Sequence, residues 1–310
     1  MAPPDDHRPS PLPRVSVITV TRNLIDAGRQ QRFRAAVDCV QAQTCRDIEH
    51  VIQDGASTDG TQDLIAGLAA QVAAQPGAVP IRWTSERDAN LYDGMNMAIA
   101  GARGRYVIFL NSDDLLGGPD TLGRLLDGAA EGSRFVYGSN LRTDDTGNRR
   151  HLKRTSTHAI FQRMPFSHNA VLLDRQMLVD LDGHDTQFPV AADYDLFFRM
   201  IASGATGVQV DACVSVFHTG GLTADDERVA ADYAAVWRKH FAAHLDMSRY
   251  SEEDLKGWYR AGAMPVAVTF ALWRAYRGVP QMRRAAAHSL GKSLRRALQP
   301  WRRARAAKGN

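Results

Sequence analysis

The sequence is poor in several features that would point to other protein classes. It has only three cysteines, Cys39, Cys45 and Cys213, and their odd number and spacing match neither a disulfide framework nor a zinc site. We therefore expect unpaired thiols in a reducing cytoplasm. No run reaches the ~18 apolar residues of a membrane-spanning helix. The first fourteen residues contain five prolines and lack the apolar core of a signal peptide, so residues 1–13 are expected to be a disordered leader.

Acidic residues are absent from the C-terminal end of the chain. Residues 255–310 contain 13 Lys or Arg and no Asp or Glu, which leaves 25 basic and 34 acidic residues, a net charge of −9, in residues 1–254. The basic tail therefore produces the overall charge of +4 and the isoelectric point of about 9.1. An acidic body without a nucleic-acid-binding motif argues against a nucleic-acid partner.

Strand-like apolar runs alternate with amphipathic helical segments in the first part of the chain. Strands are expected at 14–20, 50–53, 79–84, 105–110 and 134–137, and helices at 29–43, 61–74, 93–101 and 119–130. The alternation predicts an α/β fold with a doubly wound, mostly parallel sheet. The second half is less regular, with strand-like pieces at 169–173 and 207–217 and helices near 193–203 and 228–245.

The most informative stretch is an apolar run that stops at two adjacent carboxylates. Residues 107–110 lead directly into Asn111-Ser112-Asp113-Asp114. Open α/β sheets bind ligands outside the carboxyl ends of their strands. Two neighbouring carboxylates repel each other, and a divalent cation with oxygen ligands relieves that repulsion. A helix-capping turn needs fewer charges, so we predict a metal held against phosphates.

Polar segments also follow the first two strands. Thr21 and Asn23 lie in the loop after the first strand, and Asp54 opens the loop after the second. The carboxylate of Asp54 can accept hydrogen bonds from a nucleobase imide or a ribose hydroxyl, so we favour a ligand role for it. For Asp59, farther along the same loop, we favour the ordinary role of a helix N-cap.

A fourth polar segment lies between the third strand and its helix. Arg87 can make bidentate contacts with a phosphate. Asp88, Asp93 and Asn96 can hold a ribose or a sugar. Each of these acids and amides is also common in turns and caps, so both roles stay open.

The four segments, in this order and spacing, resemble the family-2 glycosyltransferases of the GT-A fold. The resemblance covers about residues 14–220 and is carried by residues 51–61 (VIQDGASTDGT), 92–96 (YDGMN) and 109–114 (FLNSDD). It implies a Rossmann-like, mostly parallel central sheet flanked by helices. The implied catalytic domain spans 14–225, with a nucleotide-sugar half over about 14–118 and an acceptor half over about 119–225. A helical basic extension follows at 226–310.

The resemblance also implies roles for individual residues on the donor side. Asp54 matches the aspartate that contacts the base of the sugar nucleotide, with Thr21 and Asn23 nearby. Asp113 and Asp114 match the end of the DxD motif, which binds Mn²⁺ or Mg²⁺ with the diphosphate. Asn111 stands in place of the first Asp of that motif and offers a neutral oxygen, and Ser112 lies between them among the donor-binding residues.

On the acceptor side, the resemblance implies a general base before an apolar helix. Ala192 replaces the Glu of the expected Glu-Asp pair, which leaves Asp193 as the base, and Asp193 can also cap that helix. Asp195 is expected to pair with Arg199 four residues on. Two histidines at strand ends are further candidates, although such residues are more often structural. His168 is placed beside the donor and acceptor, and His218 on the metal or diphosphate.

The implied activity is a hexosyltransferase-type reaction with inversion at the anomeric carbon. The donor is a nucleoside-diphosphate sugar, preferably a UDP-sugar, and the acceptor is a saccharide or polyprenyl-diphosphate-linked saccharide of surface polysaccharide biosynthesis. Two alternatives stay open. One is a non-catalytic, membrane-associated nucleotide-sugar binder, which the replacements at 111 and 192 allow. The other is a nucleotidyltransferase, although residues 19–23 form no glycine-rich basic phosphate loop.

The tail predicts a membrane-surface element. Residues 281–301 place apolar side chains near one helical face among many arginines, and Trp258, Trp273 and Trp301 are three of the five tryptophans. The apolar run 264–273 is expected to lie in the membrane interface. This places the protein in the cytoplasm, on the inner face of the plasma membrane. The alternative is a helix packed on the catalytic domain with a solvated basic face.

Overall fold

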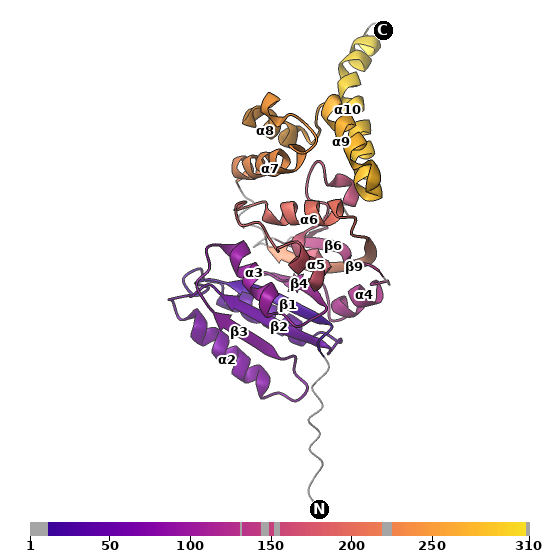
Figure 1. Cartoon of the computed structure of the whole chain (residues 1–310). Helices are drawn as coiled ribbons and strands as arrows, with labels where there is room; N and C mark the ends of the chain where they lie inside the picture. Colours follow the sequence, from indigo (N-terminus) through magenta and orange to yellow (C-terminus); the bar gives the residue numbers. More distant parts are fainter. Residues whose placement is uncertain (1–11, 131, 144–148, 152–155, 219–224, 308–310) are drawn as a thin grey trace, which may run out of the picture.

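A nine-stranded sheet forms the centre of the molecule, and helices cover it (Figure 1). The computed structural model describes residues 12–130, 132–143, 149–151, 156–218 and 225–307. Side chains at 149–151, 218 and 299–307 lie outside that description. The strands run in the order β3-β2-β1-β4-β8-β6-β9-β5, and β7 pairs with β6.

The first four strands of the sheet are parallel, as the strand–helix alternation predicts. They are β1 (Val15–Thr21), β2 (Ile48–Asp54), β3 (Ile81–Ser85) and β4 (Tyr106–Phe109). The helices between and beside them are α1 (Gln30–Gln41), α2 (Thr61–Ala73), α3 (Leu91–Gly101) and α4 (Thr121–Asp127). Strands β1, β2 and β4 are almost entirely buried. Because they are parallel, their carboxyl ends meet at one edge of the sheet, beside the loops that carry the expected site residues.

The second half of the sheet mixes strand directions. It contains β5 (Leu115–Leu116), β6 (Phe135–Thr143), β7 (Arg149–His151), β8 (Val171–Asp174) and β9 (Gly207–His218). Strand β8 is antiparallel to both β4 and β6, whereas β6 and β9 are parallel. Hydrophobic periodicity marks a strand but not its direction, and β6 is longer than the four residues expected from its apolar core.

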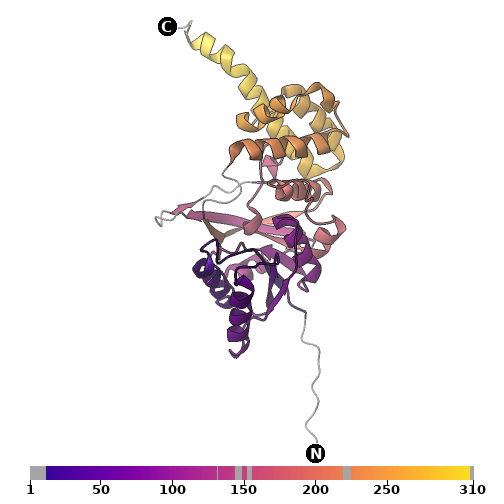
Figure 2. The ribbon, with the colours of Figure 1, turned by 90° about the vertical axis from the view of Figure 1, so that its left-hand side faces the viewer.

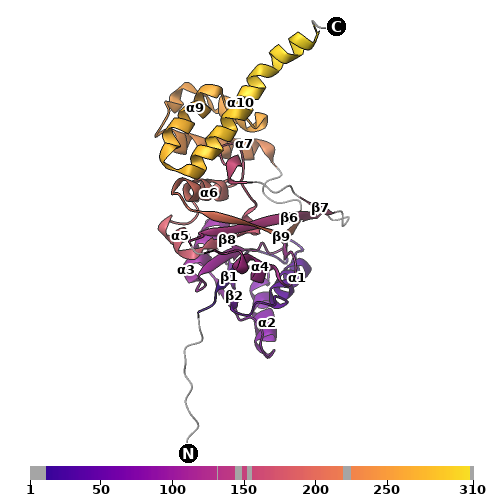
Figure 3. The ribbon, with the colours of Figure 1, turned by 90° about the vertical axis from the view of Figure 1, so that its right-hand side faces the viewer.

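Three helical segments belong to the part of the chain in which the second group of site residues is expected. The short helix η2 (His168–Ala170) leads into β8, α5 (Arg175–Asp180) follows it, and α6 (Ala192–Ala202) lies across the sheet. Figures 1 and 3 show α6 between the sheet and the C-terminal helices. Those are α7 (Asp226–Phe241), α8 (Glu252–Ala261), α9 (Val266–Ala275) and α10 (Pro280–Ala307).

The C-terminal helices share one hydrophobic core with the sheet and the helices that pack on it. The largest cluster of buried side chains joins Phe161 and Phe198 to Trp237, Trp258 and Met282. The assignment of Trp258 to a membrane interface is therefore wrong, because its indole is buried. The apolar run 264–273 does not lie in a membrane interface as a whole either, since its side chains at 264, 268 and 272 are part of the core, whereas Phe270 is exposed.

Helix α10 divides into a packed part and an exposed part. Side chains at 282, 285, 286, 289 and 293 are buried, as the packing alternative predicted, whereas Leu294 and Leu298 are exposed. Figures 2 and 3 show the end of α10 extending beyond the other helices. Within the described ranges, no helix has the length and apolar character to cross a bilayer. All three cysteines are free thiols, as expected.

Candidate active site

Asp54 joins three loops at the carboxyl edge of the parallel strands. Its Oδ1 accepts hydrogen bonds from Thr21 Oγ1 at 3.0 Å and Ser57 Oγ at 2.5 Å. Its Oδ2 accepts from the Ser57 backbone N–H at 2.9 Å and from Ser85 Oγ at 2.7 Å. The side chain is fully buried, and these four donors match the four lone-pair sites of a carboxylate. Asp54 therefore organises the loops after β1, β2 and β3.

Asn23 connects the first two of these loops. Its backbone N–H donates to Ser57 Oγ at 2.8 Å, and its Oδ1 accepts from the Thr58 N–H at 3.1 Å. The residue has a φ of 47°, a left-handed conformation that asparagine tolerates better than most residues. Asp59 accepts from the Thr61 N–H at 3.0 Å and from two N–H groups of the first loop, which ties the start of α2 to that loop.

Asp88 lies in a tight space between two glycines. A Cβ atom at Gly55 would lie 2.4 Å from Asp88 Oδ2, and one at Gly94 would lie 3.0 Å from it. Arg22 Nη1 lies 3.4 Å from Asp88 Oδ1, a partner that the sequence did not reveal. Burial raises the pKa of Asp88, and the charge of Arg22 opposes that rise. More than half of the Arg22 side chain is exposed and thus open to an anion.

The other residues of this segment mostly support the backbone. Asp93 Oδ2 accepts from the Ala89 N–H at 2.9 Å, and the Asn96 amide bonds both the N–H and the C=O of His184, each at 2.8 Å. These contacts favour the turn-and-cap alternative for Asp93 and Asn96. Arg87 is exposed, which leaves it open to a phosphate.

The two adjacent carboxylates of the turn after β4 have different surroundings. Asp114 is buried, and its Oδ2 accepts from Asn111 Nδ2 at 2.7 Å and from Asn169 Nδ2 at 2.9 Å. Asp113 retains 18% of its side-chain exposure, and its Oδ2 lies 3.7 Å from Arg29 Nη1. Asp114 thus holds the turn through its Oδ2, and its role as a metal ligand stays a prediction. Asp113 remains accessible, and Ser112, which precedes it, is buried.

The residues of this turn are compatible with a divalent cation that also binds substrate. Within the described part of the chain, no three His, Cys, Asp or Glu side chains gather into a metal-binding group. Mg²⁺ is commonly held by one or two carboxylates together with substrate phosphates, and Mn²⁺ also favours oxygen ligands. The Asp113 carboxylate fits this pattern. His218 ends β9, but its side chain lies outside the described residues.

Asp193 occupies the first turn of α6. Its Oδ1 accepts from the Tyr194 N–H at 2.8 Å, and its Oδ2 lies 3.7 Å from His168 Nδ1. Only 16% of the side chain is exposed. Burial raises the pKa of Asp193 to about 6, although the backbone hydrogen bond from Tyr194 opposes the rise. A carboxylate with this pKa is suited to accept a proton near neutral pH.

His168 connects Asp193 with the turn after β4. Its Nε2 lies 3.3 Å from Asn111 Oδ1. Because Asn111 Nδ2 donates to Asp114, its Oδ1 must be the acceptor, so the Nε2–H of His168 donates to it. Burial lowers the pKa of His168, and the charge of Asp114 opposes that effect. The structure thus brings together three residues that the sequence placed in separate segments.

Helix α7 supplies contacts that the sequence did not predict. Asp232 Oδ2 accepts from the N–H groups of Val190 and Ala191, just before α6. Lys239 and His240 both contact Asp195, which also forms the expected pair with Arg199 at 2.7 Å. No local motif marks these residues, because each partner lies more than 40 positions away along the chain.

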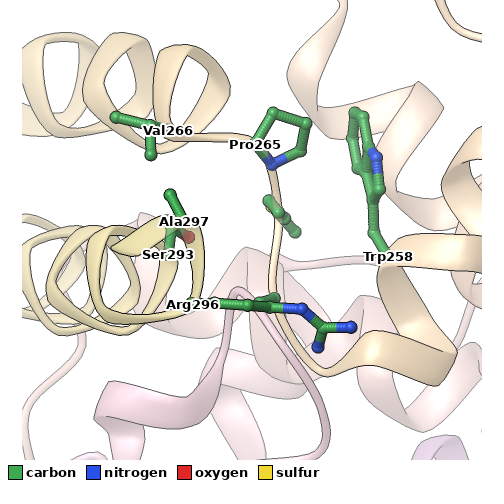
Figure 4. A pocket seen from close by; sticks show the side chains of 8 residues that line it. Trp258, Pro265, Val266, Ser293, Arg296 and Ala297 are labelled. Atoms are coloured by element: carbon green, nitrogen blue, oxygen red, sulfur yellow. The ribbon is translucent and has the colours of Figure 1, made fainter. Parts of the chain in front are cut away.

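A separate hollow of about 300 Å³ lies among the C-terminal helices (Figure 4). Trp258, Pro265 and Val266 face it from one side, and Ser293, Arg296 and Ala297 of α10 from the other. None of its lining residues was expected to bind the donor or to act as the base. The chemistry is therefore assigned to the carboxylates at the sheet edge and not to this hollow.

Comparison with known proteins identifies a family and a related sequence. The family model described as glycosyl transferase family 2 matches residues 16–195. An uncharacterized glycosyltransferase of Mycobacterium tuberculosis is 30% identical over 193 residues, which cover 60% of this chain and 68% of that protein.

Solved structures show the same arrangement at lower sequence identity. The mannosyltransferase PcManGT from Pyrobaculum calidifontis, in complex with GDP-Man and Mn²⁺, has a TM-score of 0.60 and 18% identity, over 92% of this chain and 88% of its own. S. aureus TarS 1-349 in complex with UDP-GlcNAc has a TM-score of 0.60 and 12% identity, over 92% of each chain. At these identities the likeness concerns the fold.

Proposed function

Because this chain belongs to glycosyltransferase family 2, we propose that it is an inverting, metal-dependent transferase that moves a sugar from a nucleoside-diphosphate sugar to an acceptor hydroxyl. It is an enzyme with the GT-A fold, as the sequence predicted. The observation that carries the proposal is the meeting of Asp193, His168 and Asn111 beside the turn that bears Asp113. Neither the non-catalytic binder nor the nucleotidyltransferase gains support from the family match.

The donor is assigned to the edge where β1, β2 and β4 end. The nucleoside is proposed to lie next to Asn23, against the loops that Asp54 holds together. The side chains of Asp54 and Thr21 are buried and bonded to each other, so they are proposed to support this wall, and Asp88 pairs with Arg22. The exposed guanidinium groups of Arg22 and Arg87 suit the diphosphate, because Arg makes bidentate contacts with phosphate oxygens. Uridine is the proposed base, on the resemblance in residues 51–61. GDP-Man and UDP-GlcNAc in the structural relatives support a nucleotide-sugar donor.

Asp113, with Asn111 beside it, is proposed to hold Mn²⁺ or Mg²⁺ on the diphosphate. Such a cation, when bound, neutralises charge that develops on the leaving diphosphate. Arg29, 3.7 Å from Asp113, adds a positive charge on the same side. Asp114 keeps the turn in shape through its two amide partners, and His218 remains a candidate for the diphosphate.

The transfer step follows from the environment of Asp193. Its carboxylate takes the proton of the acceptor hydroxyl, and the freed oxygen forms a bond to the anomeric carbon. The bond from that carbon to the diphosphate oxygen breaks on the opposite face, and the nucleoside diphosphate leaves with the electron pair. The acceptor oxygen displaces the diphosphate directly and no covalent sugar–enzyme intermediate forms, so no Ser or Cys nucleophile is required.

Donor and metal dependence can be tested together. We expect one nucleotide class among UDP-, GDP- and dTDP-sugars to raise the melting temperature in the presence of Mn²⁺, and a smaller rise with EDTA. Asp113→Asn should lose most of the Mn²⁺-dependent rise in melting temperature, because it removes the accessible carboxylate. Asp63→Asn, a charge change in the exposed first turn of α2, is the control. Stabilisation by no sugar nucleotide, with or without metal, would contradict the donor assignment.

The acceptor is proposed to be a saccharide, free or carried on a polyprenyl diphosphate, in surface polysaccharide biosynthesis. Lipid-linked acceptors lie at a membrane, and the C-terminal helices offer a suitable surface for the cytoplasmic face of the plasma membrane. Phe270, Leu294 and Leu298 are three of the five exposed large hydrophobic side chains of the described residues. Arg295 is exposed beside Leu294, and residues 255–310 contain no acid to repel anionic lipids.

Vesicle binding tests this surface. The intact chain should co-sediment with vesicles that contain anionic lipid and bind neutral vesicles weakly. The double variant Leu294→Asn, Leu298→Asn should weaken binding at least about 30-fold, because each leucine contributes roughly 1–2 kcal/mol when buried and about 1.4 kcal/mol corresponds to a factor of ten. Val179→Asn removes an equally exposed apolar side chain on α5 and should leave binding unchanged. The membrane proposal fails if the intact chain ignores anionic vesicles, or if the control weakens binding equally.

A further inference from the structure

Helix α7 reaches into the base site from outside the segment that matches the family. The match ends at residue 195, whereas α7 spans Asp226–Phe241. Asp232 Oδ2 nevertheless accepts hydrogen bonds from the Val190 N–H at 2.7 Å and the Ala191 N–H at 3.0 Å. These groups lie at the N-terminal end of α6, where backbone donors have no partner within the helix. The cap residue Ala191 provides no side-chain acceptor of its own.

The same backbone segment is also held by α3. The Tyr92 hydroxyl donates to the Val190 carbonyl oxygen at 2.9 Å. Both polar groups of Val190 are therefore occupied, one by α3 and the other by α7. Asp193 follows three residues later, so its position depends on this pair of contacts.

We propose that Asp232 is a positioning residue for Asp193: its carboxylate fixes the start of α6 and places a second negative charge near the base. The inference rests on the proposed function, in which Asp193 accepts the proton. It also assigns a purpose to the C-terminal helices, which complete the acceptor side of the site. Ala192 lacks the carboxylate that the resemblance led us to expect beside Asp193, and Asp232 provides one from another helix.

Several charged or titratable groups surround Asp193. Tyr92 faces it from α3, His168 from η2, and Asp232 and Tyr233 from α7. After burial, which raises the pKa of Asp193 most, the negative charge of Asp232 raises it further. Removal of that charge should therefore lower the pKa of Asp193.

Two substitutions separate the charge of Asp232 from its hydrogen bonds. Asp232→Asn keeps an acceptor oxygen for the two N–H groups, and we expect the acidic limb of the kcat/KM profile to move down by roughly half a pH unit to one unit. Asp232→Ala leaves both N–H groups without an acceptor, so kcat should fall at least about tenfold while the donor KM changes little. Asp226→Asn makes the same charge change at the exposed start of α7 and should alter neither quantity.

A measurement without substrate distinguishes this inference from the proposed function. The free energy of unfolding in urea is measured against pH for chains with and without Asp193→Asn, each with and without Asp232→Asn. In chains that keep Asp232, the change in the free energy of unfolding caused by Asp193→Asn should vary with pH around pH 6. In chains that carry Asp232→Asn, it should vary at lower pH. An unchanged transition, with an unchanged kcat profile, would overturn the role of Asp232. Full activity of Asp193→Asn would instead refute the base assignment.

Discussion

Asp193→Asn is expected to lower the transfer rate by about 10²–10⁴-fold, the range typical for loss of a general base. The amide has the shape of the carboxylate but cannot accept the acceptor's proton. Asp193 lies on α6 with His168 as its neighbour, away from Asp54 and its hydroxyl partners, so donor binding should be retained. The check is a transfer assay combined with donor-induced thermal stabilisation. A near wild-type rate would remove Asp193 from this role.

The pH dependence of the same variant provides a second check. Because the base acts when ionised, the wild-type kcat/KM should fall as the pH drops through about 6. The raised pKa also affects stability: the folded state favours the protonated acid, so stability is lost as pH rises from about 4 through 6. Asp193→Asn should therefore be more stable than the wild type above pH 6 and gain nothing below pH 4. Asp63→Asn, in the exposed first turn of α2, should show neither effect.

The donor side of the site could be predicted because it is local in the sequence. Each loop follows directly from a buried strand, and the carboxyl ends of parallel strands meet at one edge. The order of the segments with Asp54, Asp88 and Asp113 thus implied their proximity. The orientation of individual carboxylates could not be predicted in this way. Asp114 turns out to bond Asn111 and Asn169, and the second of these amides lies 55 residues away.

The acceptor side depends on contacts between distant segments. Asp193 was predicted from its motif, but its neighbours come from α3, η2 and α7. Amphipathic periodicity predicted α7 as a helix and did not show which residues it would cover. The tail illustrates the same limit, since charge and tryptophan content suggested a membrane element although Trp258 belongs to the core. Composition alone cannot distinguish a helix that packs from one that meets a membrane.

The second large effect is expected when Asp195 is replaced, and it concerns the free energy of unfolding. This carboxylate is fully buried and accepts from Arg199 Nε at 2.7 Å, Lys239 Nζ at 2.8 Å and His240 Nε2 at 2.8 Å. Asp195→Ala leaves these donors without their shared acceptor and removes the link between α6 and α7. Loss of one partner in a buried ionic network costs about 3–5 kcal/mol. Urea unfolding at pH 7 should show a decrease of this size.

The pH dependence of stability tests whether the charge of Asp195 causes this effect. Burial alone would raise the pKa of Asp195, but hydrogen bonds from His240 and Lys239 and the charge of Arg199 hold it well below the ordinary value. A lowered pKa means that the stabilisation is present above about pH 4 and is lost as pH falls below it. As the pH falls, the free energy of unfolding should thus decrease more for the wild type than for Asp195→Asn. Asp195→Asn also replaces Asp195→Ala in this test if the alanine variant does not fold.

A neighbouring ion pair provides the matched control for this network. Asp185 also contacts Lys239 at 2.7 Å, but its side chain is partly exposed, and its other hydrogen bonds come from the neutral Gln187. Water replaces such a partner readily, so Asp185→Ala should cost less than about 1 kcal/mol. If the two alanine variants lose equal stability, burial of Asp195 does not govern the effect. If Asp195→Ala alone is strongly destabilised and also inactive, the network that joins α6 to α7 supports both the fold and the base.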